Sequence, residues 1–238
     1  MSRSTVLGRV VGLWRYPVKS MAGEPLSSVE VGWHGLVGDR RWAFIRDGMT
    51  MSGFPWLTLR ECPAMAHYHP RLLDLSQPNR SATTVRTPSG DSLDVADPAL
   101  AAQLWPDGAR LLRQDRGIFD TFPLSLISTR TIASLARDVG RELEVMRFRP
   151  NLLIETDNEA DYPEVEWVGR TLQLGALQLR VDQRDGRCVI ITQDPDTGER
   201  DTRVLRQVRD RQQGCLGVYA STVRPGSVQL GDALQALD

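Results

Sequence analysis

The sequence predicts a mainly β protein of the α+β class, with a β-barrel, a few helices and an N-terminal β-rich module. Short β-branched runs recur along the chain between turns rich in Gly, Pro, Asn and Asp. Only residues 128–140 show a strong helical period, and between residues 49 and 97 no helical period exceeds two turns. Many short strands with one strong helix are typical of a barrel.

Size, charge and cysteine content limit the class of protein further. The chain has 238 residues, 41% of them hydrophobic, and can bury one large core or two modest ones. A net charge of −1 gives no global attraction to nucleic acid or to an acidic membrane, so a bound anion needs a local cluster. No secretory signal or membrane-spanning run is present, and the odd, widely spaced Cys62, Cys188 and Cys215 favour reduced thiols. We therefore expect a cytoplasmic protein without a membrane segment or a nucleic-acid partner.

Residues 1–115 are predicted to form the first, β-rich module. Residues 6–16 are apolar and β-branched, and Pro17 ends this strand because it cannot donate to a ladder, so Lys19 and Ser20 lie just past the strand. A short helix is predicted over residues 97–105, where Asp97 is an N-cap candidate followed by proline. Further extended segments are predicted at residues 26–33, 41–46, 64–69 and 82–87.

Residues 116–238 are predicted to form a second domain of mostly antiparallel sheet. A strand at residues 124–127 leads into the clearest helix, which Ser128 caps at its start and Gly140 ends. Ser128 thus marks a helix start whose backbone amides could also face an anion. The remaining predicted elements are a strand at residues 152–155, two strands within residues 164–181 that break at Gly175, and a hairpin-like pair at residues 217–223 and 227–234.

The segment at residues 186–198, GRCVIITQDPDTG, is the centre of the functional analysis. The β-branched residues 189–192 predict a strand with Cys188 at its mouth, the turn at residues 194–198 predicts a hairpin, and Arg200 opens the return strand. Cysteine often packs as a small hydrophobe. The neighbouring Arg187, however, favours a thiolate, the form that attacks electrophiles or binds soft metals. Both interpretations stay open from these residues alone.

Other polar positions give weaker indications. The 29 basic residues include a single lysine, Lys19, whose compact ammonium differs from the planar fork of arginine. Arg147 and Arg149 lie two apart on a predicted extended segment, so they suit a phosphate or belong to a solvated rim. His67 and His69 lack a third metal ligand and are interpreted as surface histidines. Phosphate-loop, dinucleotide-binding, hydrolase-elbow and zinc-helix motifs are absent.

An ordered set of short motifs resembles a known family. YPVKS occurs at residues 16–20, GDRRW at 38–42, RFRPN at 147–151 and RCVIITQDPDTG at 187–198, followed by GVY and PGSVQLGD. In this order they resemble a MOSC-domain protein with its N-terminal MOSC β-barrel module, in the branch that includes the mitochondrial amidoxime-reducing component and its bacterial relatives. The resemblance covers nearly the whole chain, and it implies an N-terminal module at residues 1–115 and a MOSC domain at residues 116–238.

The resemblance implies a molybdenum cofactor, in which a molybdopterin dithiolene holds the metal and Cys188 supplies the protein thiolate. A soft thiolate ligand agrees with the general preferences of such metals. By motif position, the residues that would hold the pterin and its phosphate are Lys19, Ser20, Arg40, Ser128, Arg149, Asn151 and Arg187.

The implied activity is a molybdenum-dependent reductase that removes oxygen from small N-hydroxylated compounds such as amidoximes and hydroxylamines. Cys188 is the implied catalytic ligand, and Asp194 and Asp120 are the candidates for a general acid. Two alternatives remain. Cys188 could carry a persulfide, as in sulfurase-type relatives, or the chain could bind and deliver the cofactor without turnover.

Electrons are expected from a separate electron-donor protein. Three isolated cysteines cannot hold a four-thiolate iron–sulfur cluster, and no dinucleotide-binding motif is present. The sequence also lacks the N-terminal segment of membrane-anchored relatives and the iron–sulfur domain of some bacterial ones.

Overall fold

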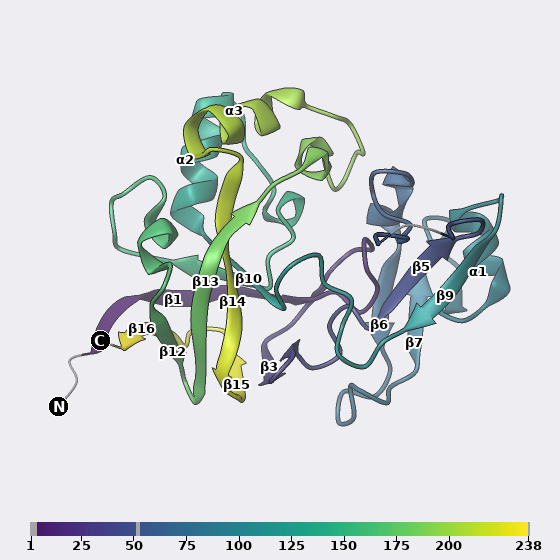
Figure 1. Cartoon of the computed structure of the whole chain (residues 1–238), viewed down its shortest axis with the longest axis horizontal. Helices are drawn as coiled ribbons and strands as arrows, with labels where there is room; N and C mark the ends of the chain where they lie inside the picture. The colour runs from purple at the N-terminus through teal and green to yellow at the C-terminus, as the bar shows by residue number, and fades with distance from the viewer. Residues whose placement is uncertain (1–3, 51–52, 238) are drawn as a thin grey trace.

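In the computed structural model, residues 4–50 and 53–237 are described. They form two parts, a barrel with helices at one end and a smaller β-rich module beside it (Figure 1). The barrel strands are β1 (Ser4–Arg15), β10 (Leu124–Ser128), β11 (Leu152–Glu155), β12 (Thr171–Leu174), β13 (Leu177–Gly186), β14 (Cys215–Arg224) and β16 (Ala233–Leu237). The prediction of a mainly β α+β protein with a barrel is confirmed.

The barrel closes through β1. The sheet order is β11-β10-β14-β13-β12-β16-β1, and β1 also pairs with β11, so the described strands make a ring of seven. Among the strand pairs of this described ring, only β10–β11 is parallel. Alternate side chains point inward and fill the interior with apolar residues, among them Leu13, Leu126 and Val181.

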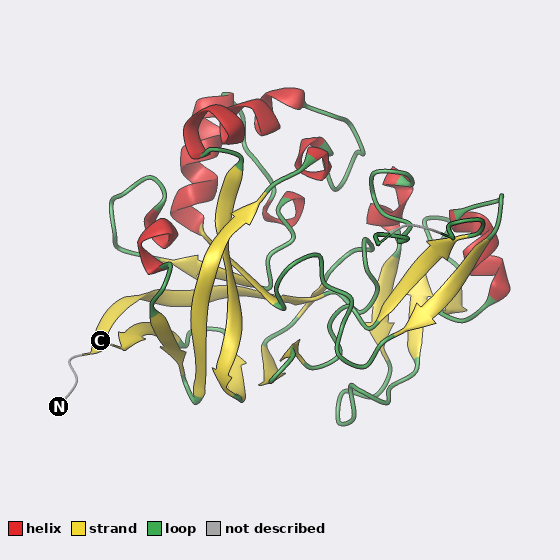
Figure 2. Ribbon diagram, viewed as in Figure 1, coloured by secondary structure: helices red, strands yellow, loops and turns green. Residues whose placement is uncertain are grey.

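The two 11-residue helices cover one end of the barrel (Figure 2). α2 (Thr129–Val139) begins at Ser128, whose hydroxyl accepts from the backbone N–H of Thr131, and ends at Gly140 in the left-handed conformation. α3 (Thr202–Gln212) packs beside α2, and both helices share an apolar cluster with the barrel end. None of the helices in the described ranges is both long and apolar enough to cross a membrane.

The N-terminal module forms a second core. Its elements are β5 (Trp42–Arg46), β6 (His69–Leu72), β7 (Thr83–Arg86), β8 (Ser92–Asp94), β9 (Ala109–Arg113), α1 (Pro98–Leu104) and the 3₁₀ helix η1 (Pro63–His67). Their apolar side chains pack around Phe44, Met65 and Leu100. The chain passes from β1 straight into this core, where Val18 and Met21 are buried, and Lys19 and Ser20 between them face the barrel side.

Several local predictions were wrong because tertiary contacts override strand propensity. Residues 64–69 were predicted to be extended, but η1 occupies most of them, and the start of the segment at residues 164–181 forms η3 (Pro163–Trp167). The predicted return strand at Arg200 is a single bridge to Gln193, after which Asp201 caps α3. β15 (Gly226–Gln229) pairs with β3 (Ser28–Gly32) and not with β14. The remaining short strands are β2 (Glu24–Pro25) and β4 (Gly35–Leu36).

The predicted strand at residues 189–192 is a 3₁₀ helix, η4 (Val189–Thr192). Its turn is held by the Thr192 hydroxyl, which donates to the Val189 carbonyl at 2.7 Å, and by Arg147, whose Nη1 donates to the carbonyls of Ile191 and Thr192. Cys188 therefore follows the end of β13 and precedes η4, in a loop that a buried guanidinium fixes.

Glu164 gives a test of the packing between η3 and α2. Its buried carboxylate accepts from the hydroxyls of Ser128 at 2.8 Å and Thr131 at 2.7 Å. Burial raises the pKa of Glu164 despite these bonds. The folded chain thus keeps this proton to a higher pH than the unfolded chain does, so stability is lost as the pH rises through the folded-state pKa.

We therefore expect Glu164→Gln to flatten the fall in unfolding free energy between about pH 5 and pH 8, because a neutral amide does not ionise. At the acid end the variant should stay within about 1 kcal/mol of wild type, since both hydroxyls keep an acceptor. Urea unfolding at both pH values measures this, with exposed Glu166→Gln on the same turn as control. A wild-type pH dependence in Glu164→Gln would contradict the assignment.

Candidate functional site

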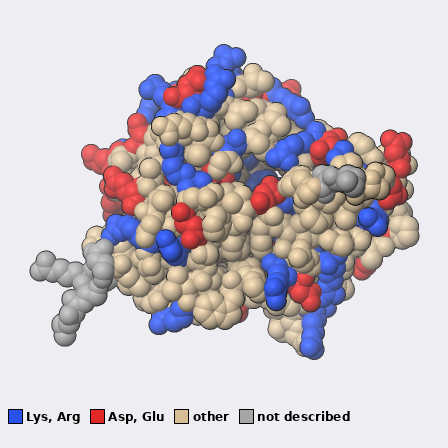
Figure 3. Space-filling model, viewed as in Figure 1, with Lys and Arg blue, Asp and Glu red and all other residues tan. Residues whose placement is uncertain are grey.

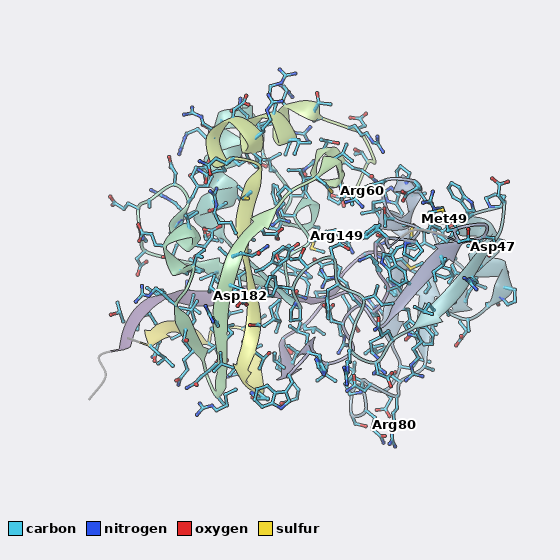
Figure 4. The ribbon with its side chains drawn as sticks, in the orientation of Figure 1. Asp47, Met49, Arg60, Arg80, Arg149 and Asp182 are labelled. Atoms are coloured by element: carbon cyan, nitrogen blue, oxygen red, sulfur yellow. The ribbon has the colours of Figure 1, made fainter. Side chains whose placement is uncertain are left out.

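A pocket opens where the barrel, the N-terminal module and the loop carrying Cys188 meet. The space it encloses, counting its opening to solvent, is about 820 Å³. Figure 3 shows a hollow between the two parts with basic side chains in it, and Figure 4 shows Arg60 and Arg149 near its opening. The predicted site residues that line it are Lys19, Ser20, Arg40, Asp120, Arg149, Asn151, Arg187 and Cys188.

Backbone geometry marks this pocket as unusual. Ser20, Arg40 and Arg149 have φ angles of 68°, 47° and 52°, in the left-handed region that residues with a Cβ rarely adopt. In residues 4–50 and 53–237, the only other non-glycine residue with positive φ is Gln213, the C-cap of α3. Such conformations cost about 1–3 kcal/mol each and tend to gather at functional sites. The strain therefore indicates a ligand site.

Lys19 is buried in the pocket wall. Its side chain is 7% exposed, and its ammonium forms an ion pair with the half-exposed Asp120 and donates to the Ile118 carbonyl at 3.1 Å. Burial lowers the pKa of Lys19, while Asp120 opposes the change. The pair places one cation and one anion at the pocket wall.

Arg40 is held by a network of buried polar groups. Its guanidinium pairs with Asp39 and approaches the Asn151 side-chain oxygen at 3.4 Å. The Asn151 amide nitrogen donates to the Trp14 carbonyl at 3.1 Å and to Asp39 at 3.2 Å, and its oxygen accepts from the Ser125 backbone N–H at 3.2 Å. Asn151 thus orients Arg40 and has little capacity left to contact a ligand directly.

Arg149 is the cation available to a ligand. Its guanidinium lies 4.5 Å from the ring centre of Tyr16, and within the described ranges it has no hydrogen bond or ion pair to another side chain. Burial lowers the pKa of Arg149 to about 10, and nearby Arg40 adds to the effect. A charged group that is partly withdrawn from water without an anionic partner is destabilised, so an anion here would stabilise it.

Arg187 mainly holds the pocket wall together through hydrogen bonds to backbone carbonyls. Its Nε donates to the Leu216 carbonyl at 2.8 Å and its Nη1 to the Phe148 carbonyl at 2.7 Å. Its Nη2 lies 2.9 Å from a carboxylate oxygen of Asp185, although without good hydrogen-bond geometry. The side chain ties the end of β13 to β14 and to the RFRPN loop.

Cys188 presents its thiol to the pocket next to a cation from the other part of the molecule. Nη2 of Arg60 donates to the Cys188 sulfur at 3.2 Å, and the Arg60 guanidinium also lies 5.4 Å from the Phe54 ring centre. No group of three His, Cys, Asp or Glu residues able to hold a metal occurs in the part of the chain that the structure describes. A metal at Cys188 would have to bring other ligands with it.

Comparison with known proteins supports the assignment suggested by the motifs. The model of the MOSC N-terminal beta barrel domain matches residues 7–114, and that of the MOSC domain matches residues 113–235. The chain belongs to the MOSC domain family. Human mitochondrial amidoxime-reducing component 1 is 24% identical, over 97% of this chain and 83% of that protein.

Other MOSC proteins align over most of the chain as well. The molybdenum cofactor sulfurase of Caenorhabditis briggsae is 25% identical over 96% of this chain, and that of Drosophila mojavensis is 26% identical over 90%. The chain spans about a third of the length of these sulfurases, 36% and 32%. The YUAD protein from Bacillus subtilis shares the fold at 12% identity, with a TM-score of 0.50 over 99% of this chain and 98% of that one.

Two predicted site residues lie away from the pocket of this MOSC protein. Ser128 is fully buried, and its hydroxyl is used by Glu164 and by the cap of α2. The Asp194 carboxylate accepts from Arg147 at 2.8 Å and from Arg141 at 3.3 Å. Burial raises the pKa of Asp194, but the backbone N–H groups of Thr197 and Asp196 outweigh it and lower the pKa overall. Neither residue meets a pocket ligand in this geometry.

The prediction of an extended segment at Arg147 and Arg149 was also wrong. The RFRPN segment is not extended, because η2 (Val145–Arg147) and the left-handed Arg149 turn the chain. Arg147 is buried against Asp194 and Glu144, and only Arg149 has a free guanidinium. The first arginine of the motif holds the cysteine loop, and the second faces the MOSC pocket.

Three titratable groups that line the pocket were not predicted from the sequence. Arg60 reaches it from the N-terminal module, Asp185 from the end of β13, and Tyr219 from β14. Tyr219 lies in the GVY motif that contributes to the family resemblance, but the motif alone gives this tyrosine no role. Asp185 immediately precedes the GRC segment, but nothing in its spacing distinguishes it from other acidic residues.

Proposed function

We propose that this MOSC protein binds a molybdenum cofactor in the pocket and uses it to reduce small N-hydroxylated compounds such as amidoximes and hydroxylamines. The observation that carries the proposal is the meeting of one thiol, Cys188, with a cluster of cations that includes the unpaired guanidinium of Arg149. The names of the relatives support the choice of cofactor, because they include an amidoxime-reducing component and molybdenum cofactor sulfurases.

The residues of the pocket fit such a group. An anionic phosphate would satisfy Arg149, whose guanidinium lacks a partner, and Lys19 could exchange Asp120 for the same anion. Cys188 would supply one soft ligand, and a dithiolene would supply the sulfur ligands that the described residues do not. The cofactor, when bound, supplies the two-electron chemistry that removes oxygen from nitrogen.

The chain's own residues then orient and hold the reacting groups. Arg60 fixes the Cys188 sulfur from the N-terminal module, so the ligand thiolate is held by both parts of the molecule. Arg147, with Asp194, fixes the loop that follows Cys188. Arg40 and Asn151 keep the opposite wall in place. Such fixed surroundings limit the movement of ligand and cofactor, as expected for a preorganised site.

Expression in a host that makes the molybdenum cofactor tests the proposal. The purified protein should contain molybdenum by elemental analysis, and it should convert benzamidoxime to benzamidine when a reduced viologen dye supplies the electrons. Protein that carries molybdenum yet leaves benzamidoxime and other N-hydroxylated compounds unchanged would refute the reductase activity.

Sulfur transfer is a second candidate, favoured by the alignment of molybdenum cofactor sulfurases over 96% of this chain. In that case Cys188 would carry a persulfide, and no molybdenum would be needed for its formation. Intact-mass analysis before and after reduction distinguishes the two, since a persulfide adds one sulfur that a thiol reductant removes.

We expect the loaded protein to need an external electron donor. NADH with benzamidoxime should give no benzamidine until a redox protein or an artificial reductant is added, because the sequence has no dinucleotide-binding motif and too few cysteines for a four-thiolate cluster. The measurement is NADH absorbance together with benzamidine formation. Sustained coupled oxidation of NADH by this single chain would show that the expectation is wrong.

A further inference from the structure

Asp185 is a carboxyl group of the pocket wall that the proposed function leaves without a role. It lies near the end of β13, three residues before Cys188, and is 1% exposed. The other acidic candidates lie in different surroundings, because Asp120 is half exposed and Asp194 lies outside the pocket. A buried carboxyl group beside a reactive site is the usual form of an acid that works near neutral pH.

The surroundings of Asp185 support both the neutral and the ionised carboxyl. The Ser125 hydroxyl donates to Oδ2 at 2.9 Å, and Nη2 of Arg187 lies 2.9 Å from the same atom. Oδ1 is buried without a well-formed hydrogen bond to any group in the described ranges, and the Tyr219 hydroxyl is close enough to interact with the carboxyl. Arg187, Tyr219 and the more distant Arg40 are the titratable groups that act on it.

Burial is the largest influence on this group, and it raises the pKa of Asp185 although Arg187, Ser125, Tyr219 and Arg40 all act to lower it. Asp185 therefore keeps its proton to a higher pH than an ordinary aspartic acid. After that proton leaves, the Arg187 guanidinium at 2.9 Å stabilises the carboxylate that remains. Burial therefore favours the protonated acid, and Arg187 stabilises the carboxylate that forms when the proton leaves.

We propose that Asp185 donates a proton to the oxygen that leaves the substrate nitrogen, an inference that rests on the proposed function. Overall, an N–OH group with two electrons and two protons gives N–H and water. The N–O bond breaks, one O–H bond and one N–H bond form, and the separate redox protein supplies the electrons. One proton comes from the O–H bond of Asp185, which is left as a carboxylate, and the other comes from solvent, which later reprotonates Asp185.

The protonation state is measured on the cofactor-free protein, where no turnover is needed. Infrared spectra recorded over a pH series should show, in wild type, the carbonyl stretch of a neutral carboxylic acid that persists to a higher pH than an ordinary aspartic acid allows. Asp185→Asn should remove that band, and Asp182→Asn, on the same strand, should keep it. Asp185→Glu should shift the band, so the assignment does not depend on one variant folding. A wild-type spectrum with no Asp185-dependent band overturns the proposal.

Turnover by the molybdenum-loaded protein gives the second measurement, with reduced viologen as electron donor. Asp185→Asn should lower kcat about 100-fold, the lower end for a lost general acid, and should lose the fall in rate at alkaline pH that marks a protonated group. Asp185→Glu should recover part of the rate. An unchanged kcat and pH profile in Asp185→Asn overturns the donor role alone, whereas an inactive loaded wild type overturns the proposed function on which it rests.

Discussion

Cys188→Ser is expected to abolish molybdenum-dependent reduction of N-hydroxylated compounds while leaving the fold intact. A hydroxyl is a much poorer ligand than a thiolate for a soft metal. Changing residues that only support a ligand already costs about 10- to 100-fold, so loss of the ligand itself should exceed that range. The swap nearly conserves volume, and its effect on unfolding free energy should stay below about 1.5 kcal/mol. Benzamidine formation, molybdenum content and urea unfolding are measured on the same preparation.

The other two cysteines provide matched controls for this substitution. Cys62 packs against the core of the N-terminal module, and Cys215 begins β14; neither lines the pocket. Cys62→Ser and Cys215→Ser should therefore keep both molybdenum and activity. Wild-type activity in Cys188→Ser, or loss of molybdenum in all three variants alike, would show that Cys188 is not the ligand.

Lys19→Ala and Arg149→Ala are expected to weaken cofactor binding far more than they weaken the fold. Hydrogen bonds to a charged group contribute about 1.5–3 kcal/mol each. That range corresponds to an affinity loss of about 10- to 150-fold for each variant. Arg149 has no partner to leave unpaired, and the Asp120 carboxylate left by Lys19→Ala is half exposed, so unfolding free energy should change little.

Cofactor retention after dialysis measures this effect, with molybdenum and phosphate determined for each variant. Arg180→Ala on β13 is a suitable control, because its side chain is 61% exposed and outside the pocket. If Lys19→Ala and Arg149→Ala retained as much molybdenum and phosphate as wild type and Arg180→Ala, the anion site would lie elsewhere.

Much of the fold was predictable because the structure that the local sequence favours is also the structure found in the folded protein. The strand that begins the chain, the helix capped by Ser128 and the short helix after Asp97 all have the expected composition and the expected caps. The segment after Cys188 was not predictable from propensity. Its β-branched residues favour a strand, but the carbonyls of Ile191 and Thr192 bind Arg147, which lies 44 and 45 positions earlier in the chain.

Part of the candidate site was likewise predictable from the sequence and part was not. Ordered motifs identified most of the residues that line the pocket, since each motif lies at the end of a strand or in a tight turn. The motif alone could not tell which of Arg147 and Arg149 would be free to bind a ligand. Arg147 is paired because it meets the carboxylate of Asp194, which lies far away in the sequence. Arg60 contacts Cys188 across 128 positions, and no local pattern reports such a contact.

The pairing of β1 with β16 has a consequence for how the protein is made. Ser4 aligns with Leu237, so the first strand of the barrel finds one neighbour only in a strand that is synthesised long after it. During synthesis, which proceeds at about 5–20 residues per second, the N-terminal module could assemble early, but the barrel cannot close until β16 has emerged from the ribosome. Until then the exposed edge of β1 is open to pairing with other chains. Chaperone demand and loss to aggregation should therefore be greatest in late nascent chains that lack only the last strand.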